Sequence, residues 1–253
     1  MSARTITGYW LGTRPYAEVL ELQEQLHTAR RQKQIGDSVL FLEHTPVVTF
    51  GRGAKEAHLL ASPSLLEEHG VELVRTGRGG DVTLHAPGQL VCYPIVDLAP
   101  DRQDVRAYVN LLTHVMQAII SPSGIAAGTL PGYVGLWVDA DAPHSWLGPE
   151  FAREPKKIGA IGVRISRWVT LHGFALNLSI DLRAFSLIVP CGIREYGVTS
   201  VRELSGVAPE TRVAAELGLT QLALALRATT GPLRDLEGLK LDQYFERVAS
   251  VVS

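Results

Sequence analysis

The chain has 253 residues, of which 46% are hydrophobic and 20% are charged, and its formal net charge is -2. This length can bury a sizeable core, and the composition is typical of a globular protein in solution. The near-balance of charge argues against bulk electrostatic binding to nucleic acid or to a membrane surface. No apolar run approaches the ~20 residues that span a bilayer, and the N-terminus has no apolar core of a signal peptide. We therefore expect a cytoplasmic protein.

The N-terminal part of the chain alternates helical and strand patterns. Apolar residues recur at three- and four-residue steps in 13–34, which predicts an amphipathic helix. The runs 38–43 and 47–51 are rich in strand formers, and the few residues between them predict a hairpin. Ser62-Pro63 is typical of the start of a short helix, and residues 71–76 predict another strand.

Residues 75–97 read RTGRGGDVTLHAPGQLVCYPIVD and form the first motif that points to a ligand. The glycines free the backbone for a close approach to a ligand, although the pattern matches neither common phosphate-binding motif. The runs 82–84 and 90–96 predict paired strands around a tight turn at 86–88. His85 lies beside this turn, where a single histidine is more often a structural hydrogen-bonding group than a catalytic one.

The middle of the chain continues the alternation. Asp101 or Asp104 is a candidate N-cap for a helix that ends near Ile120. Residues 132–138 predict a strand. Residues 139–156 are polar and contain several prolines, which is typical of an exposed loop.

The last third predicts a pair of strands and then helices. The runs 158–165 and 168–178 are expected to be adjacent strands. Two helices with a break at a glycine are expected over 209–217 and 219–229, and a third over 241–252.

Strands alternate with helices throughout, with no linker-like break, internal repeat or low-complexity tract. This pattern predicts an α/β (α+β) fold. We expect a single domain over residues 1–253, in which the helical elements of 205–253 pack against the rest.

The two cysteines, Cys92 and Cys191, are too few for a disulfide framework or a zinc site. Cys92 lies in an apolar strand and is expected in the core. Cys191 lies between a proline and a glycine, downstream of Lys157 in the run KIGAIG. A cation such as Lys157 would lower the pKa of a nearby thiol and make it a nucleophile that carries an acyl group. The residues alone equally allow Cys191 to be a small buried hydrophobic side chain.

Three stretches together resemble the octanoyltransferases of lipoate biosynthesis, the lipoyl(octanoyl) transferase family. They are RGGDVTLHAPGQLVCYPIVDL at 78–98, KIGAIGVRISRWVTLHGFALNL at 157–178 and IVPCGIREYGVTSV at 188–201. The resemblance is strongest over residues 42–204. Because that family shares its fold with lipoate and biotin protein ligases, the resemblance implies a mixed β-sheet flanked by helices.

By this resemblance, Cys191 is the catalytic nucleophile that carries the acyl thioester, and Lys157 is the partner that lowers its pKa and moves protons. An octanoyl chain needs a groove into which few side chains project, which explains the small residues. The residues implied to line this substrate pocket are Arg78, Gly79, Gly80, Asp81, Val82, Thr83, Leu84, His85, Ala160, Ile161, Gly162, Gly173, Phe174 and Ala175.

The chain departs from the family pattern near the first motif. The family often has glutamine in place of Asp81, usually an aromatic residue in place of Leu84, and usually glycine in place of Ala86 and Cys92. The changes at Leu84 and Ala86 are expected to bear on the shape of the acyl pocket. Asp81 brings a negative charge beside the site.

The resemblance implies a ping-pong transfer of an octanoyl or lipoyl group from octanoyl-acyl carrier protein to a lysine of a lipoyl domain. The implied acceptors are the lipoyl domains of 2-oxoacid dehydrogenase complexes and the glycine cleavage H protein. The incoming thioester is already activated, so no cofactor, ATP or metal is expected. Two alternatives are a lipoate protein ligase, which would use ATP and not need Cys191, and a protein that only binds acyl chains or carrier proteins.

Overall fold

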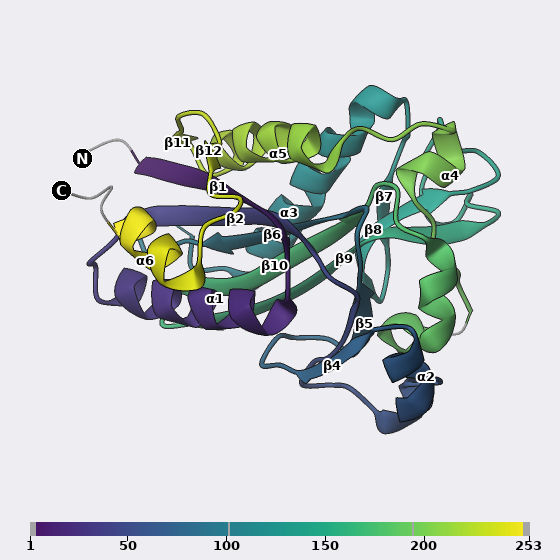
Figure 1. Ribbon diagram of the computed structural model, residues 1–253. Helices are drawn as coiled ribbons and strands as arrows, with labels where there is room; N and C mark the ends of the chain where they lie inside the picture. The colour runs from purple at the N-terminus through teal and green to yellow at the C-terminus, as the bar shows by residue number, and fades with distance from the viewer. Residues whose placement is uncertain (1–3, 101, 194, 250–253) are drawn as a thin grey trace.

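In the computed structural model, which describes residues 4–100, 102–193 and 195–249, helices cover both faces of a long mixed sheet (Figure 1). The strands of this sheet are β1 (Arg4–Arg14), β2 (Asp37–His44), β6 (Gln89–Ile95), β7 (Gly128–Leu130), β8 (Tyr133–Asp139), β9 (Pro155–Ser166), β10 (Val169–Asn177), β11 (Ala228–Thr229) and β12 (Arg234–Asp235). Within the described residues their order is β11-β1-β2-β6-β10-β9-β8-β7, with β12 also beside β1.

The sheet is mixed because β1 pairs in parallel with β2, β11 and β12. Helix α1 (Tyr16–Arg31) carries the chain back to the end of the sheet at which β1 begins, so β1 and β2 run parallel. Each neighbouring pair from β2 through to β7 is antiparallel. β2 lies inside the sheet and is buried along almost its whole length, as its run of apolar residues requires.

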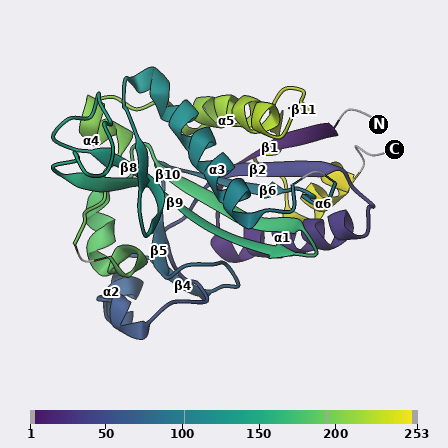
Figure 2. The ribbon, with the colours of Figure 1, turned by 180° about the vertical axis from the view of Figure 1, so that it is seen from behind.

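Helices form a layer on each side of the sheet (Figure 2). α3 (Val105–Ile120) and α5 (Thr211–Ala225) pack on one face, where Phe41, Cys92 and Phe174 belong to the largest buried cluster. α1 and α6 (Leu241–Ala249) pack on the other face, against side chains such as Leu40 and Tyr93. No helix in the described part of the chain combines the length and the apolar character that a membrane span requires.

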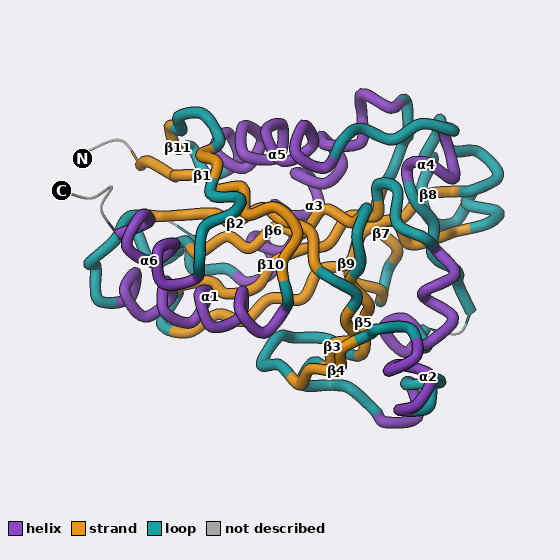
Figure 3. Tube along the Cα trace, viewed as in Figure 1, coloured by secondary structure: helices purple, strands orange, loops and turns teal. Residues whose placement is uncertain are grey.

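A second sheet lies beyond one end of α1 (Figure 3). Its strands are β3 (Val47–Phe50), β4 (Glu72–Arg75) and β5 (Val82–His85), in the order β4-β3-β5. It packs against α2 (Pro63–Glu68) and η3 (Leu182–Leu187) around a third buried cluster that includes Val48, Leu66, Leu84 and Ile188. The remaining elements of the described chain are short: η1 (Glu56–His58), η2 (Ser121–Ser123), which follows α3, η4 (Pro190–Gly192) and α4 (Val201–Ser205).

Most of the elements expected from local pattern are confirmed. The mixed α/β fold is observed, and the strands expected over 158–165 and 168–178 pair as β9 and β10. The Asp104 carboxylate accepts a hydrogen bond from Ala107 N at the start of α3, while Asp101 lies outside the described residues. Cys92 is completely buried in the core, and this burial raises the pKa of its thiol well above the ordinary value.

Two predicted strand pairings are wrong. β2 and β3 do not form a hairpin, because β2 pairs with β1 and β6 while β3 joins the small sheet. β5 and β6 also belong to different sheets, so the turn at 86–88 carries the chain from one sheet to the other. The sequence pattern also missed β1, which occupies one edge of β2, while β6 occupies the other, so no edge of β2 is left for β3.

The break expected within the C-terminal helices is also wrong. Gly218 lies inside the continuous helix α5, and a Cβ at this position would lie 3.1 Å from atoms of both Phe41 and Ile119. The glycine therefore lets α5 approach the sheet and α3 closely instead of ending a helix.

Candidate active site

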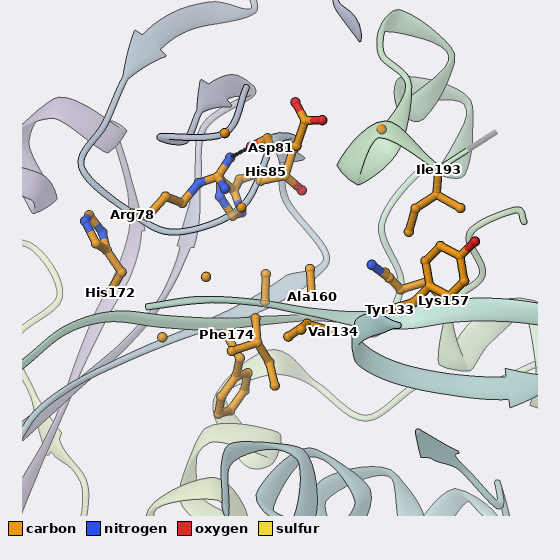
Figure 4. Close-up of a pocket in the computed structure, with 18 of the residues that line it drawn as sticks. Arg78, Asp81, His85, Tyr133, Val134, Lys157, Ala160, His172, Phe174 and Ile193 are labelled. Carbon is orange, nitrogen blue, oxygen red and sulfur yellow. Dashed lines mark hydrogen bonds between the residues drawn. The ribbon is translucent and has the colours of Figure 1, made fainter. Parts of the chain in front are cut away.

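A cavity of about 460 Å³ lies between the α1 face of the main sheet and the small sheet (Figure 4). Its floor consists of Ala160 and Gly162 on β9 and their cross-strand partners Ala175 and Gly173 on β10. None of these residues carries more than a methyl group, so the sheet surface stays open over two neighbouring strands. Such a floor suits an extended apolar ligand.

The glycine loop before β5 forms the opposite wall. A Cβ at Gly162 would lie 2.9 Å from Gly79 O, so the loop approaches β9 within the space that a side chain would fill. Arg78 is 7% exposed and braces the loop, donating hydrogen bonds to Thr49 O over 2.7 Å and to Asp81 O over 2.6 Å. The guanidinium group thus ties the loop to β3 while lining the cavity.

Successive side chains of β5 point to opposite faces, so only some residues of the first motif line the cavity. Thr83 and His85 line the cavity, whereas Val82 and Leu84 point into the core of the small sheet. Ala86 also belongs to that core. Leu84 and Ala86, which were expected to bear on the shape of the acyl pocket, therefore do not line this cavity and pack behind its wall. The remaining lining residues among those expected are Arg78, Gly80, Asp81, Lys157, Ala160, Ile161, Gly162, Gly173, Phe174 and Ala175, while Gly79 contributes no lining atoms.

Lys157 on β9 lies at one end of the cavity (Figure 4) and is 5% exposed. Its Nζ lies 4.9 Å from the ring centroid of Trp137, and an indole face attracts a cation. Tyr133 and Tyr196 pack edge-on against this indole. Gly135 leaves room for the lysine, since a Cβ there would lie 3.3 Å from Lys157 Cε. The ammonium group is thus placed in an aromatic enclosure that opens on the cavity.

The segment that contains Cys191 is joined to the Lys157 strand. Lys157 N donates a hydrogen bond to Gly197 O, and Lys157 O accepts one from Thr199 N, each over 3.0 Å. The main chain of Cys191 forms part of η4, but its side chain lies outside the described residues. The next residue, Gly192, lines the same cavity as Lys157.

His85 is held in one tautomer by a chain of buried amides. Gln89 Nε2 donates to Asn177 Oδ1 over 2.9 Å and to Leu84 O, so Gln89 Oε1 accepts from His85 Nδ1 over 2.7 Å. The other ring nitrogen, Nε2, is then a hydrogen-bond acceptor. Burial holds the pKa of His85 well below its ordinary value, and the neighbouring His44 lowers it further.

Two more histidines are buried nearby and neutral. His44 Nδ1 donates to Arg14 O over 3.0 Å, and Tyr93 OH donates to His44 Nε2 over 2.8 Å. His172 lines the far end of the cavity from Lys157 (Figure 4), and neither of its ring nitrogens has a hydrogen-bond partner within the described residues. Burial lowers the pKa of His44 to about 4 and, with the charge of Arg78 as a second cause, that of His172 to about 3.

The backbone of His172 is strained. Its φ is +59°, which is uncommon for a residue other than glycine and costs of order 1–3 kcal/mol. The buried side chain of Gln23 on α1 accepts a hydrogen bond from His172 N over 3.0 Å and so holds this conformation. The strain turns the imidazole into the cavity.

These buried histidines predict a steep loss of stability in acid. At a pH between about 4 and 6.5, the unfolded chain binds a proton at His44 that the folded chain excludes, so the free energy of unfolding falls as the pH falls through this window. His44 alone is expected to lower the free energy of unfolding by about 3 kcal/mol across this window. Urea unfolding of the wild type and of His44→Gln at a series of pH values measures it, and the variant should show a shallower dependence. His69→Gln, at an exposed histidine, is the control. An equally steep dependence in His44→Gln would contradict the assignment.

Sequence reasoning missed part of the cavity. Tyr16 on α1, Tyr93 on β6 and His172 close it at one end, and Tyr133 and Val134 lie near Lys157. No local signal marks these residues, because they come from four elements that are far apart in the sequence: α1, β6, β8 and β10. The unexpected lining residues are Tyr16, Gly53, Tyr93, Gly132, Tyr133, Val134, His172, Gly192 and Ile193.

The chain resembles known proteins over most of its length. The model of the lipoyl protein ligase A/B catalytic domain matches residues 15–222. Octanoyltransferases from Myxococcus xanthus, Solibacter usitatus and Chloroflexus aurantiacus are 47%, 46% and 41% identical over 83%, 77% and 87% of this chain. The chain spans 56%, 81% and 93% of the length of these three proteins, respectively.

Solved structures agree on the fold. A lipoate protein ligase from T. acidophilum with bound lipoic acid superposes with a TM-score of 0.65 at 16% identity, over 99% of this chain and 94% of that one. Lipoate-protein ligase A bound with ATP gives a TM-score of 0.66 at 18% identity, over the same shares. The family match and the identities above 40% show that the chain belongs to the lipoyl protein ligase A/B catalytic domain family and is a transferase.

Proposed function

We propose that this enzyme transfers an octanoyl group in lipoate biosynthesis, from acyl carrier protein to a specific lysine of a lipoyl domain. The octanoyltransferase relatives at 41–47% identity support the acyl group and the reaction class. Lipoyl domains of 2-oxoacid dehydrogenase complexes and the glycine cleavage H protein are the proposed acceptors. The whole chain acts as one catalytic domain in this proposal.

The observation that carries the proposal is the placement of Lys157. This lysine is buried at one end of a cavity whose floor is apolar. The strand that carries it is hydrogen-bonded to the segment that follows Cys191. A cation beside a thiol favours the thiolate, which is the nucleophilic form. In the proposed reaction, Cys191 attacks the acyl thioester and carries the octanoyl group as a new thioester. The amine of the acceptor lysine then attacks that thioester and forms the amide.

The acyl chain would lie along the floor of small residues. Ala160, Gly162, Gly173 and Ala175 leave the surface of β9 and β10 open from the Lys157 end toward His172. The carbonyl would then sit near η4 and Lys157, and the methyl end would point to the region of Tyr16 and Tyr93. Because the donor thioester is already activated, the proposed reaction uses no ATP.

A transfer assay tests this function directly. The enzyme is mixed with octanoyl carrier protein and a lipoyl domain in the absence of ATP, and the intact masses of all three proteins are followed. We expect a gain of one octanoyl group on the lipoyl domain, preceded by an octanoyl adduct on the enzyme. A lipoyl domain whose acceptor lysine is replaced by arginine is the control, and it should stay unmodified.

Two other outcomes would refute the proposal. Transfer only from free octanoate with ATP would identify a ligase instead. Binding of the carrier protein with no acyl transfer under either condition would identify a binding protein.

A further inference from the structure

His172 is a buried polar side chain with unmet hydrogen bonds at the far end of the cavity from Lys157 (Figure 4). It is 1% exposed, and neither ring nitrogen has a hydrogen-bond partner within the described residues. Because burial lowers its pKa to about 3, the imidazole is neutral, so one nitrogen has a proton to donate and the other a lone pair. Buried polar groups in folded proteins are nearly always paired. An unpaired imidazole in a cavity wall therefore points to a partner that arrives with the ligand.

The end wall of the cavity consists of Tyr16, Tyr93 and His172, and the polar groups around it have partners of their own. Tyr93 OH donates to His44 Nε2 over 2.8 Å, and the Tyr93 ring packs edge-on against the His172 imidazole with 6.3 Å between centroids. His85 Nδ1 donates to the side chain of Gln89. Among the described residues, these neighbours leave the His172 imidazole unpaired.

The backbone of His172 is an independent sign of a role in ligand binding. Side chains alternate along a strand, so residue 172 is expected to face the α3 side of the sheet, where Phe174 belongs to the buried cluster. Instead, the φ of +59° turns the imidazole into the cavity, and the hydrogen bond from His172 N to Gln23 Oε1 holds it there. Strain of this kind persists where the surrounding structure enforces it, and it is most frequent at functional sites.

The distance from the cavity floor to His172 matches the length of an octanoyl chain. Ala160 lies on the floor, and His172 pairs with Val163 on the same strand, β9. The three residue steps from Ala160 to Val163 span about 10 Å. An extended chain of eight carbons is about 9 Å long. An acyl carbonyl above Ala160, on the Lys157 side, thus brings the eighth carbon to the imidazole.

A saturated chain and a chain with a polar end meet this imidazole differently. Carbons beyond the eighth would press against the ring and keep both nitrogens from any partner, which is costly for a buried polar group. A hydroxyl group on the eighth carbon, in contrast, can donate to one nitrogen or accept from the other.

Resting on the function proposed above, we propose that His172 sets the specificity of the site for the far end of the acyl group. It rejects saturated chains longer than octanoyl, and it accepts an eight-carbon chain that ends in a hydroxyl group. The substrate class thus extends from the plain octanoyl thioester to ω-hydroxyacyl thioesters of the same length.

His172→Gly is the substitution that the strained backbone favours. Glycine adopts a positive φ readily, and the main-chain N–H that bonds Gln23 is kept. The variant therefore opens the end wall while it relieves strain. Arg167→Gly is the matched control, because Arg167 also has a positive φ, of +50°, but is exposed in the β9–β10 turn and outside the cavity lining.

The test is a competition between two acyl carrier proteins at equal concentration. Intact mass of the enzyme early in loading gives the ratio of the two acyl adducts, which reports relative kcat/KM and is independent of the overall activity of a variant. With decanoyl against octanoyl, the wild type should favour octanoyl, and His172→Gly should raise the decanoyl share about 10-fold. With 8-hydroxyoctanoyl against octanoyl, His172→Gly should lower the hydroxyacyl share about 5-fold. Arg167→Gly should give the wild-type ratio in both competitions.

A second variant and the melting temperatures guard against a misfolded protein. His172→Asn shortens the side chain, and asparagine tolerates a positive φ, so it should raise the decanoyl share by a smaller factor than glycine does. A wild-type ratio in His172→Gly for either pair of donors would overturn this inference and leave the proposed function intact. Absence of any octanoyl adduct on the wild type would overturn the proposed function, and this inference with it.

Discussion

Replacement of Cys191 with alanine is expected to abolish the octanoyl adduct on the enzyme and to reduce transfer to the lipoyl domain below detection. The alanine side chain has no nucleophile, so the two-step path through a thioester is lost. Intact mass after mixing with octanoyl carrier protein measures the adduct, and the mass of the lipoyl domain measures transfer. Alanine removes only one sulfur atom from a short turn, so the thermal midpoint should change little.

Cys92→Ala is the matched control for this result. Cys92 lies in the core with no exposed surface, and burial raises the pKa of its thiol, so it should take no part in the reaction. The variant should be less stable, since it leaves a small cavity, yet it should form the adduct. An adduct that persists in Cys191→Ala, or disappears in Cys92→Ala at a temperature where that variant is folded, would refute the assignment of the nucleophile.

Replacement of Lys157 with methionine should reduce octanoyl loading by about 10²–10⁴-fold with little effect on stability. Methionine fills nearly the same buried space but supplies neither a charge nor a proton. Lys157→Arg keeps the positive charge, and arginine does not lose its proton in proteins. If the lysine acts only as a cation, the arginine variant should therefore retain more activity than the methionine variant.

Lys156→Met is the control for the lysine series. This neighbouring lysine on β9 forms an ion pair with Glu154 over 2.7 Å at the surface and lies outside the cavity lining. Its replacement should leave loading unchanged. Wild-type loading by Lys157→Met would show that the buried ammonium has no part in the reaction, and equal losses in the methionine and arginine variants would point to proton transfer by the lysine.

Local pattern predicted many elements well because their causes are local. Helices α1 and α3 follow from apolar residues at helical spacing, and the Asp104 cap marks the start of α3. The β9–β10 hairpin follows from two strand-forming runs joined by a turn of two residues. Partner choice among the other strands was beyond the sequence, because β2 is buried on both faces and its neighbours come from distant positions in the chain.

The candidate site also has a part that the sequence predicted and a part that only the fold showed. The motifs around Arg78, Lys157 and Cys191 mark the family, and the small residues of β9 and β10 mark the cavity floor. Only the fold shows that Thr83 lines the cavity and Leu84 does not, since neighbouring residues of a strand point to opposite faces. Leu84 packs behind the cavity wall and contributes no lining atoms.

The sequence by itself determined the family and most of the helices and strands, and it suggested Lys157 and Cys191 as the reactive pair, because all of these depend on short stretches of neighbouring residues. The tertiary structure alone decided which distant residues come into contact. His58 and Asp81 are separated by 23 positions, and Gln23 and His172 by 149, yet each pair is in contact. Contacts of this kind form only when distant strands are brought together by burial of the apolar faces between them, and no periodicity along the chain records them.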